Sequence, residues 1–363
     1  MAQPERIREL EEELQGTKYN KRTQKAVGVL KAKIAQLREK QERRGSGKGA
    51  GSGYAVSKSG DATVVLLGFP SVGKSTLLNA LTGAQSAVGA YAFTTLTVIP
   101  GLLEHRGAKI QILDVPGVLQ GAAAGTGRGK EVLAVIRNAD LVLLLLDVFH
   151  PGHLPVLLKE VHDTNIRINV RKPDVNVVRK ERGGLDLGVT VKLTQLERET
   201  IEAILREFRV VNAQVVVRED VTADELIDVL EGNRVYLPAI VAVDKIDLVS
   251  KRKLLEVMRA TKADIAVSGE TKENIEALKE LIFQKLRFIR IYTKEARKDA
   301  DMDVPLIIRS GATVEQVCMK LHKDFVKKFR FARVWGKSAK FAGQKFGMEH
   351  ALKDGDVVEV HVR

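Results

Sequence analysis

Apolar residues recur with two different spacings along the chain of 363 residues. Near the N-terminus they return every three or four positions, at Ile7, Leu10, Leu14, Val27, Leu30, Ile34 and Leu37. This spacing is typical of amphipathic helices, and a break near Gly16 and Asn20 separates two of them. The pattern therefore predicts a helical hairpin over residues 1–44.

After a Gly/Ser-rich linker at residues 45–60, the pattern of apolar residues changes. Short, nearly continuous apolar runs end in Gly, Asp or Ser: TVVLLG (63–68), KIQILD (109–114), LVLLLLD (141–147), AIVAVD (239–244) and ADIAVS (263–268). Helical segments are expected between them at 74–81, 130–138 and 272–286. Buried strands alternating with helices predict an α/β domain with a doubly wound, mostly parallel sheet. Ligands of such sheets bind at the carboxyl ends of the strands, where the polar residues fall.

The interval between the third and fourth runs is too long for a single crossover connection. It contains a basic sequence with a strand-like pattern (IRINVRKPDVNVVRK), a helical pattern (TQLERETIEAILREF) and a further strand–helix pair. We therefore expect the sheet domain to cover 61–164 and 234–287, with an inserted α+β subdomain at 165–233. Beyond residue 288 the sequence predicts strands before and after one helix, which is expected from Val314 to Phe329. This predicts a β-rich C-terminal domain at 288–363.

Composition narrows the class of protein. The formal net charge is +13, which favours a polyanionic partner over a basic surface without a ligand. A single cysteine, Cys318, excludes an internal disulfide framework, and the charged N-terminus does not resemble a signal peptide. No apolar run approaches the length of a membrane span. We expect a cytoplasmic protein with no membrane partner.

The clearest motif is a phosphate-binding loop. The text from Gly68 to Thr76 matches G-x-x-x-x-G-K-[ST], with a strand before it and an apolar-periodic helix after it. Backbone N–H groups of such a loop surround phosphates, and the helix N-terminus favours negative charge. Lys74 would contact the outer phosphates and Ser75 would offer a hydroxyl to Mg²⁺. The predicted nucleotide-binding residues here are Gly68, Pro70, Ser71, Val72, Gly73, Lys74, Ser75 and Thr76.

A second motif closes the next strand. Asp114-Val-Pro-Gly117 fits D-x-x-G, in which the Asp faces Mg²⁺ through water and the Gly amide senses the γ-phosphate. Between the two motifs, YAFTTLTVIPG offers Thr94 and Thr95, of which we prefer Thr95 as the hydroxyl that reaches Mg²⁺. The predicted metal set is therefore Ser75, Thr95 and Asp114. The Gly-rich run after Gly117 suits a switch segment ordered by γ-phosphate contacts.

The stretch VDKID at the end of the fourth run differs by one residue from N-K-x-D, which reads guanine in many P-loop proteins. Asp247 can accept from guanine N1–H and the 2-amino group, and the stem of Lys245 can cover the base. Asp244 stands where Asn is expected. An ionised Asp would lose the donor to guanine N7, at a cost of about 1–3 kcal/mol. We expect weaker binding with guanine specificity retained. After the next run, VSGET offers Ser268 and the amides of Gly269 and Glu270 near guanine O6.

Together these motifs resemble those of translation-factor-class GTPases. The texts FTTLTVIPG, DVPGVLQGAAAGTGRGKEV and PLIIRSGATVEQVCMKLHKDF…DGDVVEVHV narrow the resemblance to the developmentally regulated GTP-binding (DRG) family of Obg-like GTPases. The resemblance covers essentially the whole chain. It implies an S5-like fold for the insertion, a C-terminal TGS domain, and GTP hydrolysis with Mg²⁺ as cofactor, in which Lys74, Thr95 and Gly117 are the expected catalytic residues.

The residue after D-x-x-G raises a difficulty. Ras-like enzymes place a Gln there to orient the attacking water, whereas Val118 can neither donate nor accept. Three sources of activation remain open: the γ-phosphate itself, a monovalent cation such as K⁺ near Ser71, or a group from a partner. Gln120 and Arg128 could reach the phosphates, although a role in a solvated loop is the simpler interpretation.

Basic residues mark the predicted polyanion surfaces. Residues 320–345 carry Lys320, Lys323, Lys327, Lys328, Arg330, Arg333, Lys337, Lys340 and Lys345, with aromatic residues between them. In so small a domain we expect most of the rings to be core. The insertion adds Arg167, Arg171, Lys172, Arg179, Lys180 and Arg182. Because phosphate neutralisation needs Lys/Arg density, these surfaces fit RNA or the ribosome.

Two functions from different classes follow. One is a GTP/GDP switch that docks on RNA or the ribosome and is regulated by another protein. The other is an RNA-binding scaffold in which the nucleotide is mainly structural. The charged N-terminal hairpin either packs on its neighbour or contacts RNA. Sequence-specific DNA binding is not expected, and an ATP-dependent enzyme is disfavoured by Asp247.

Overall fold

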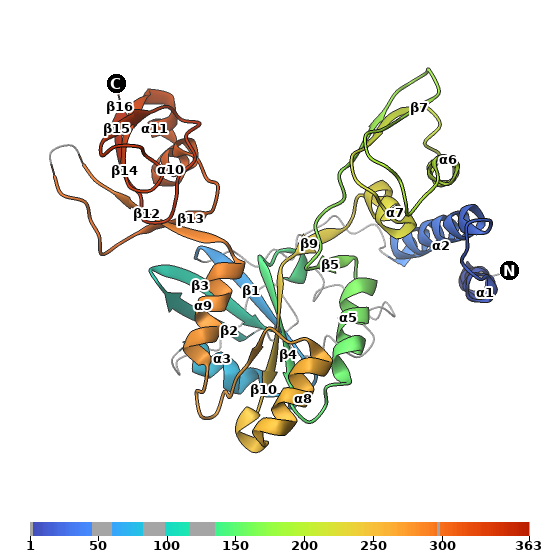
Figure 1. The fold of residues 1–363 in the computed structure, drawn as a ribbon, viewed down its shortest axis with the longest axis horizontal. Helices are drawn as coiled ribbons and strands as arrows, with labels where there is room; N and C mark the ends of the chain where they lie inside the picture. Colours follow the sequence, from blue (N-terminus) through green and yellow to red (C-terminus); the bar gives the residue numbers. More distant parts are fainter. Residues whose placement is uncertain (1–2, 46–59, 83–98, 116–134, 296–297, 363) are drawn as a thin grey trace. The chain divides into compact units, whose positions relative to one another are not determined.

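The computed structural model describes residues 3–45, 60–82, 99–115, 135–295 and 298–362 (Figure 1). Its internal contacts divide the chain into two compact units. One unit joins Met1–Gly53 to Asn165–Tyr236, and the other joins Tyr54–Thr164 to Leu237–Arg363. In the described part of the chain, no helix is long and apolar enough to cross a membrane.

The larger unit is built on a six-stranded sheet in the order β11-β10-β4-β1-β3-β2. Its strands are β1 (Ala62–Leu67), β2 (Ile99–His105), β3 (Ala108–Asp114), β4 (Leu141–Asp147), β10 (Ala239–Asp244) and β11 (Ile265–Ala266). All neighbours pair in parallel except β2, which runs antiparallel to β3. This confirms the predicted mostly parallel sheet. In its register, Leu66 lies opposite Asp114, and Asp147 lies opposite Asp244, so the polar strand ends meet at one edge.

Helices cover both faces of this sheet because its strands are apolar on both sides. Alternate residues such as Leu66, Ile112 and Leu143 form one core with α3 (Lys74–Thr82) and α9 (Ile275–Lys285). Figure 1 shows α5 (His153–Asp163) on the other side of the sheet. The turn η1 (Ile246–Leu248) and α8 (Lys251–Thr261) follow β10.

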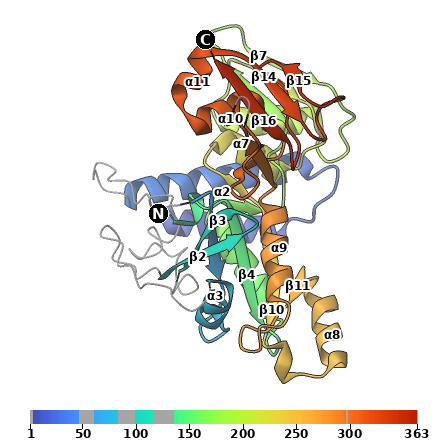
Figure 2. The same ribbon diagram turned by 90° about the vertical axis from the view of Figure 1, so that its left-hand side faces the viewer.

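The C-terminal domain is a five-stranded sheet in the order β13-β12-β16-β14-β15, packed on two helices (Figure 2). Its elements are β12 (Phe288–Thr293), β13 (Leu306–Arg309), α10 (Val314–Leu321), α11 (Lys323–Lys328), β14 (Phe329–Trp335), β15 (Gln344–Phe346) and β16 (Val357–Val362). Residues including Ile291, Val317, Val334 and Val358 form its core.

Two ion pairs tie this domain to the amino ends of central strands. Lys320 Nζ lies 2.7 Å from the carboxylate of Asp61, which precedes β1. Arg309 Nη2 lies 2.6 Å from Asp140, which precedes β4. Ile307 also packs into the core of the central sheet. The C-terminal domain therefore contacts the sheet at the edge opposite to the polar strand ends.

The smaller unit contains the N-terminal helices α1 (Gln3–Gly16) and α2 (Gln24–Gly45), which share a core of Ile7, Leu10, Leu30 and Ile34. Its strands and further helices are β5 (Ile166–Ile168), β6 (Val175–Arg179), β7 (Leu185–Val189), α6 (Arg198–Glu207), β8 (Ala213–Val217), α7 (Ala223–Glu231) and β9 (Val235–Leu237). The strands form a sheet in the order β6-β8-β7 and a ribbon of β5 with β9. Ala32 of α2 belongs to the core of the three-stranded sheet.

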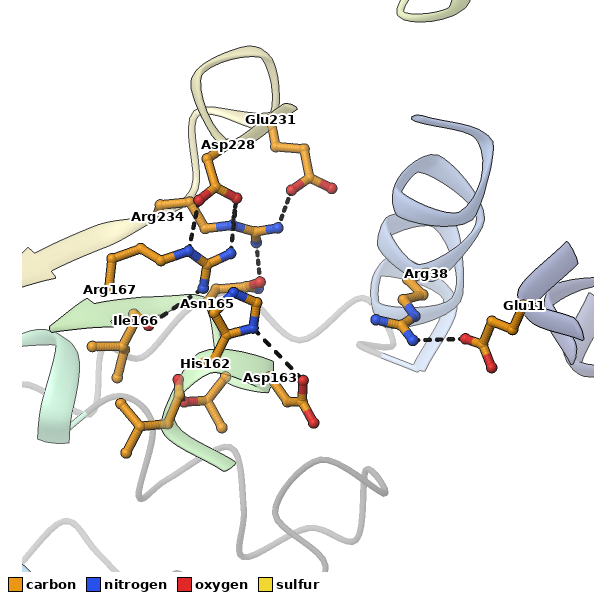
Figure 3. A network of polar contacts seen from close by, with 12 residues as sticks. Glu11, Arg38, His162, Asp163, Asn165, Ile166, Arg167, Asp228, Glu231 and Arg234 are labelled. Atoms are coloured by element: carbon orange, nitrogen blue, oxygen red, sulfur yellow. Dashed lines mark hydrogen bonds and ion pairs between the residues drawn. The ribbon is translucent and has the colours of Figure 1, made fainter. Parts of the chain in front are cut away.

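A buried polar network joins α7 to the two-stranded ribbon (Figure 3). The Asp228 carboxylate accepts from Arg167 Nε at 2.6 Å and Nη2 at 2.8 Å, and from Arg234 Nε at 2.7 Å. Arg234 also contacts Asn165 and Glu231. Asp228 is 6% exposed. Arg167, which the sequence suggested for an RNA surface, is therefore engaged inside this unit.

The structure corrects the expected C-terminal helix. The pattern predicted one helix from Val314 to Phe329, but α10 and α11 are separated at His322, whose backbone is extended (φ −167°). The His322 ring nitrogen Nδ1 accepts from the N–H of Asp324 and so caps α11. Of the helix expected at 130–138, residues 135–137 are helical and 130–134 lie outside the described residues.

We predict that Asp228→Ala loosens α7 and the β5–β9 ribbon. The substitution leaves two largely buried guanidinium groups without their shared carboxylate, a change that costs about 3–5 kcal/mol in local stability. Hydrogen exchange of the amides of α7 and the ribbon, measured on the full chain, should accelerate accordingly. Glu219→Ala is the matched control, because it removes the exposed pair with Arg171 and should leave those amides unchanged. Unchanged exchange in Asp228→Ala would contradict a stabilising role for the network.

Candidate functional site

The phosphate-binding loop connects β1 to α3. Lys74 Nζ donates to the carbonyls of Gly68 and Phe69, each at 3.0 Å, so the ammonium is held over the loop. Ser71 and Gly73 have left-handed backbones, with φ of 60° and 106°. At Gly73 any side chain would also collide with Oδ2 of Asp244. Glycine is required there because the loop passes directly against the end of β10.

Ser75 and Asp114 meet at the start of α3. Ser75 Oγ donates to Asp114 Oδ2 at 3.3 Å, and Asp114 Oδ1 is buried with no hydrogen-bond partner among the described residues. Burial raises the pKa of Asp114, against the opposing effects of Lys74 and Ser75. Burial also lowers the pKa of Lys74, while Asp114 opposes that shift. A buried, partly unsatisfied carboxylate beside a hydroxyl suits a hard cation such as Mg²⁺.

The remaining predicted phosphate and metal residues, Thr95 and Gly117, lie outside the described residues, as do Thr94, Val118, Gln120 and Arg128. Of the predicted metal set, the structure brings together Ser75 and Asp114.

The segment after β10 approaches the phosphate loop through Lys245. Lys245 Nζ donates to the Ser71 carbonyl at 2.8 Å and to Asp147 Oδ2 at 2.9 Å. Its backbone is left-handed, with φ of 63°, which is uncommon for a residue other than glycine. The N–H of Lys245 donates to Asp244 Oδ1 at 2.7 Å. Asp247 follows in η1 and is exposed, so its carboxylate is open to a ligand.

The segment after β11 joins the same site. The N–H of Gly269 donates to Asp244 Oδ1 at 2.9 Å, and Gly269 packs closely against the start of α3 at Leu77. Ser268 is fully buried, and its hydroxyl accepts from the N–H of Thr271 at 3.0 Å. The N–H of Glu270 has no partner among the described residues. Of the two amides predicted near guanine O6, that of Glu270 is the one available.

Asp147 is a site residue that the motif analysis did not select. It ends β4, opposite Asp244 in the register, and pairs with Lys245. Although burial alone would raise its pKa, the N–H of Phe149 and the Lys245 ammonium hold the pKa of Asp147 below its usual value. The available signal was its position at the carboxyl end of a buried strand. The LVLLLLD run contained it, but no nucleotide motif names an Asp there.

Aromatic rings flank this pair. Phe69 of the phosphate loop stacks on His153 of α5 with centroids 4.0 Å apart, and His153 stacks on His150 at 5.1 Å. His150 Nδ1 lies 3.8 Å from Asp147 Oδ2. The spacing His150-x-x-His153 therefore corresponds to a ring stack that packs the phosphate loop against α5.

Comparison with known proteins places this geometry in context. A family model described as a 50S ribosome-binding GTPase matches residues 63–180, its C-terminal region matches 182–288, and a TGS domain model matches 289–362. An uncharacterized GTP-binding protein of Methanocaldococcus jannaschii is 55% identical over 363 residues, covering 99% of this chain and 93% of that protein.

Two further relatives carry the family's name. Developmentally-regulated G-protein 3 of Arabidopsis thaliana is 45% identical over 361 residues, with 98% of each chain covered. Developmentally-regulated GTP-binding protein 1 of Xenopus laevis is 42% identical over 359 residues, also with 98% of each chain covered.

We predict that Asp147→Asn weakens GDP binding by roughly tenfold, because it removes the charged partner of Lys245, the residue expected to cover the base. Fluorescence titration with a labelled GDP would measure the change in Kd. Asp140→Asn, at the opposite end of β4, is the matched control and should bind GDP as the unsubstituted chain does. ATP should compete poorly with all three proteins. Equal affinity of Asp147→Asn and the control would contradict this role.

Proposed function

We propose that this chain, which belongs to the family of developmentally regulated GTP-binding proteins and is a GTPase, acts as a nucleotide-dependent switch that docks on RNA or the ribosome in translation. The arrangement of charged groups and rings on the outer face of its C-terminal sheet is the observation that supports docking most directly. A cytoplasmic location follows from such a role.

The phosphate loop and the two segments after β10 and β11 support the assignment of nucleotide contacts. We assign the phosphates to the N–H groups of residues 71–76 and to Lys74. The Lys74 ammonium donates to two loop carbonyls in the structure, and phosphate oxygens would replace these carbonyls as acceptors. We assign guanine to Asp247 and the N–H of Glu270, with the Lys245 stem over the base.

Ser75 and Asp114 are the described residues that would hold Mg²⁺, which supplies charge neutralisation at the outer phosphates when bound. Lys74 adds a fixed positive charge on the same side. The protein contribution in the described part of the chain is thus positioning and electrostatic stabilisation. The group that activates water is assigned to a partner or to a monovalent cation such as K⁺, because Val118 follows the D-x-x-G motif.

The outer face of the C-terminal sheet consists of the residues that alternate with its core. Ile291, Ala332, Val334 and Val358 face α10 and α11. Successive strand residues point to opposite faces, so the outer face carries Tyr292, Lys294, Phe331, Arg333, Trp335, Lys345 and His361. Glu359 also lies on this side, but it is buried and pairs with Lys294 and His361. The expectation that most rings of this domain are core therefore needs correction. Phe325, Phe329 and Phe346 pack on the core, whereas Phe331, Trp335 and the 65% exposed Phe341 do not.

Cations lie over the rings of this outer face. Lys345 Nζ is 4.8 Å from the centre of the Phe331 ring, and Lys294 Nζ is 4.6 Å from the Trp335 ring. Phe331 also stacks on His361 at 4.3 Å. Rings with interleaved cations bind unpaired bases by stacking and phosphates by charge. The rings and cations together support RNA as the docking partner.

The other predicted basic residues differ in whether their side chains are open to a phosphate group or already paired within the protein. Arg179, Lys180 and Arg182 of the insertion are exposed and form no ion pair with described residues, whereas Arg171 pairs with Glu219. Lys320 is held by Asp61 and by the Ile307 carbonyl. Arg167 and Lys320 are therefore left out of the surfaces that we propose for docking.

The alternative is an RNA-binding scaffold with a structural nucleotide. The same outer face supports it, because RNA contact there does not require hydrolysis. The two functions differ in whether phosphate is released.

We predict slow phosphate release from GTP in single-turnover assays of the isolated chain and faster release with ribosomes, because a missing activating group must be supplied. Lys74→Ala, which removes the phosphate-loop ammonium, is the control and should release little phosphate in either condition. Absence of hydrolysis even with ribosomes would favour the scaffold. In the same assay, a rate unchanged when NaCl replaces KCl at equal ionic strength would exclude activation by K⁺.

We also predict that replacing the exposed cations at Phe331, through Arg330→Glu with Lys345→Glu, weakens co-sedimentation with ribosomes in the docking-competent nucleotide state. The loss should be roughly tenfold or more at low salt and smaller at high salt, as expected for phosphate contacts. Lys251→Glu with Arg252→Glu on α8 carries the same charge change and should sediment normally. Equal loss in both double variants would indicate a general charge effect and contradict this docking surface.

A further inference from the structure

Asp244 occupies the position where guanine-binding motifs carry Asn. Its Oδ1 accepts the N–H of Lys245 at 2.7 Å and that of Gly269 at 2.9 Å, so one oxygen joins the two segments that form the base site. The side chain is 2% exposed. Asn would make both contacts with its amide oxygen. The carbonyl half of the Asn side chain is therefore reproduced here.

The second oxygen has a different environment. Asp244 Oδ2 forms no hydrogen bond with the described residues, and it lies against Gly73 of the phosphate loop, where a Cβ would collide with it. In Asn the corresponding atom is the amide nitrogen, which donates to guanine N7. An ionised carboxylate would instead present a lone pair to the N7 lone pair.

The charges around Asp244 do not favour its ionised form. Lys245 is the cation beside it, and the Nζ of Lys245 is already bound by Asp147 at 2.9 Å and by the Ser71 carbonyl. Asp247 on the same loop adds a negative charge that acts on Asp244. Lys74 of the phosphate loop is directed to Gly68 and Phe69. No described cation forms a salt bridge with Asp244.

We propose that Asp244 binds guanine as a neutral carboxylic acid, with Oδ1 accepting the two backbone N–H groups and the Oδ2–H donating to guanine N7. A carboxylic acid has the same acceptor-and-donor pair as an amide. Enzymes do keep buried carboxylic acids neutral so that they can donate. The proposal rests on guanine-nucleotide binding by this chain, and it replaces the ionised Asp244 expected from the sequence.

The direction of titration agrees with this geometry. Burial raises the pKa of Asp244, and the charge of Asp247 raises it further, whereas the two backbone N–H groups and Lys245 oppose the rise. The donor is therefore present below this raised pKa and is lost as the pH increases through it. Guanine-nucleotide affinity should follow the same direction.

The test is the Kd for GDP, measured from about pH 5 to about pH 8 for the unsubstituted chain and for Asp244→Asn. Asparagine keeps the acceptor and supplies a donor that does not titrate. Titration of the GDP phosphates affects both proteins equally, so the ratio of their Kd values isolates residue 244. We expect similar affinities at low pH and roughly tenfold weaker binding by the unsubstituted chain at high pH.

A second probe, 7-deaza-GDP, carries C–H in place of N7 and cannot accept. The unsubstituted chain should prefer GDP over 7-deaza-GDP by roughly tenfold at low pH and lose that preference at high pH, whereas Asp244→Asn should keep it throughout. A constant ratio of GDP affinities, or the same pH dependence with 7-deaza-GDP, would overturn the proposal. If neither protein binds GDP at any pH, guanine-nucleotide binding itself is contradicted, an outcome distinct from loss of the pH effect.

Discussion

The candidate site depends on the register of parallel strands. Backbone hydrogen bonds along β3, β1, β4 and β10 fix how far each strand extends, and side chains have no part in that ladder. Gly68, Asp114, Asp147 and Asp244 lie at the carboxyl ends of these strands, so they reach one edge of the sheet although they are far apart in sequence. A shift of one residue in β3, β4 or β10 would turn its terminal carboxylate to the other face. The buried, apolar strands on both sides make such a shift costly.

That register also sets the charges of the site. Asp147 and Asp244 end neighbouring strands, and the ammonium of Lys245 pairs with Asp147 alone. The left-handed backbone of Lys245 turns its N–H back toward Asp244, and its side chain carries the ammonium to the Ser71 carbonyl and to Asp147. One lysine therefore connects the phosphate loop, the end of β4 and the segment that follows β10. The neutral form proposed for Asp244 follows from this pairing, because the ammonium of Lys245 is engaged by Asp147.

Much of this arrangement was predictable from sequence because it is local. The phosphate loop, the strand ends and the helical hairpin each follow from short patterns, such as Gly68 to Thr76. Other features depend on contacts between distant residues. Asp147 becomes a site residue through its partner Lys245, Arg167 is withdrawn from the surface by Asp228, and the Gly269 N–H is taken by Asp244. The break at His322 was missed because histidine is not a usual cap, and β7, β2 and α8 lacked a clear pattern.

The path of α9 has a consequence for communication within the larger unit. This helix begins a few residues after the Ser268–Glu270 segment and leads directly into β12 of the TGS domain. Its 11 residues span about 16 Å, and its apolar side is buried in the core of the central sheet. The shortest covalent route to the TGS domain thus starts at the Ser268–Glu270 segment, named the base loop because we propose that it contacts guanine, whereas the D-x-x-G segment lies more than 150 residues earlier in the chain. A displacement of the base loop would reach the TGS domain as movement of a rigid rod, and a displacement at the γ-phosphate would have to pass through the packed strands first.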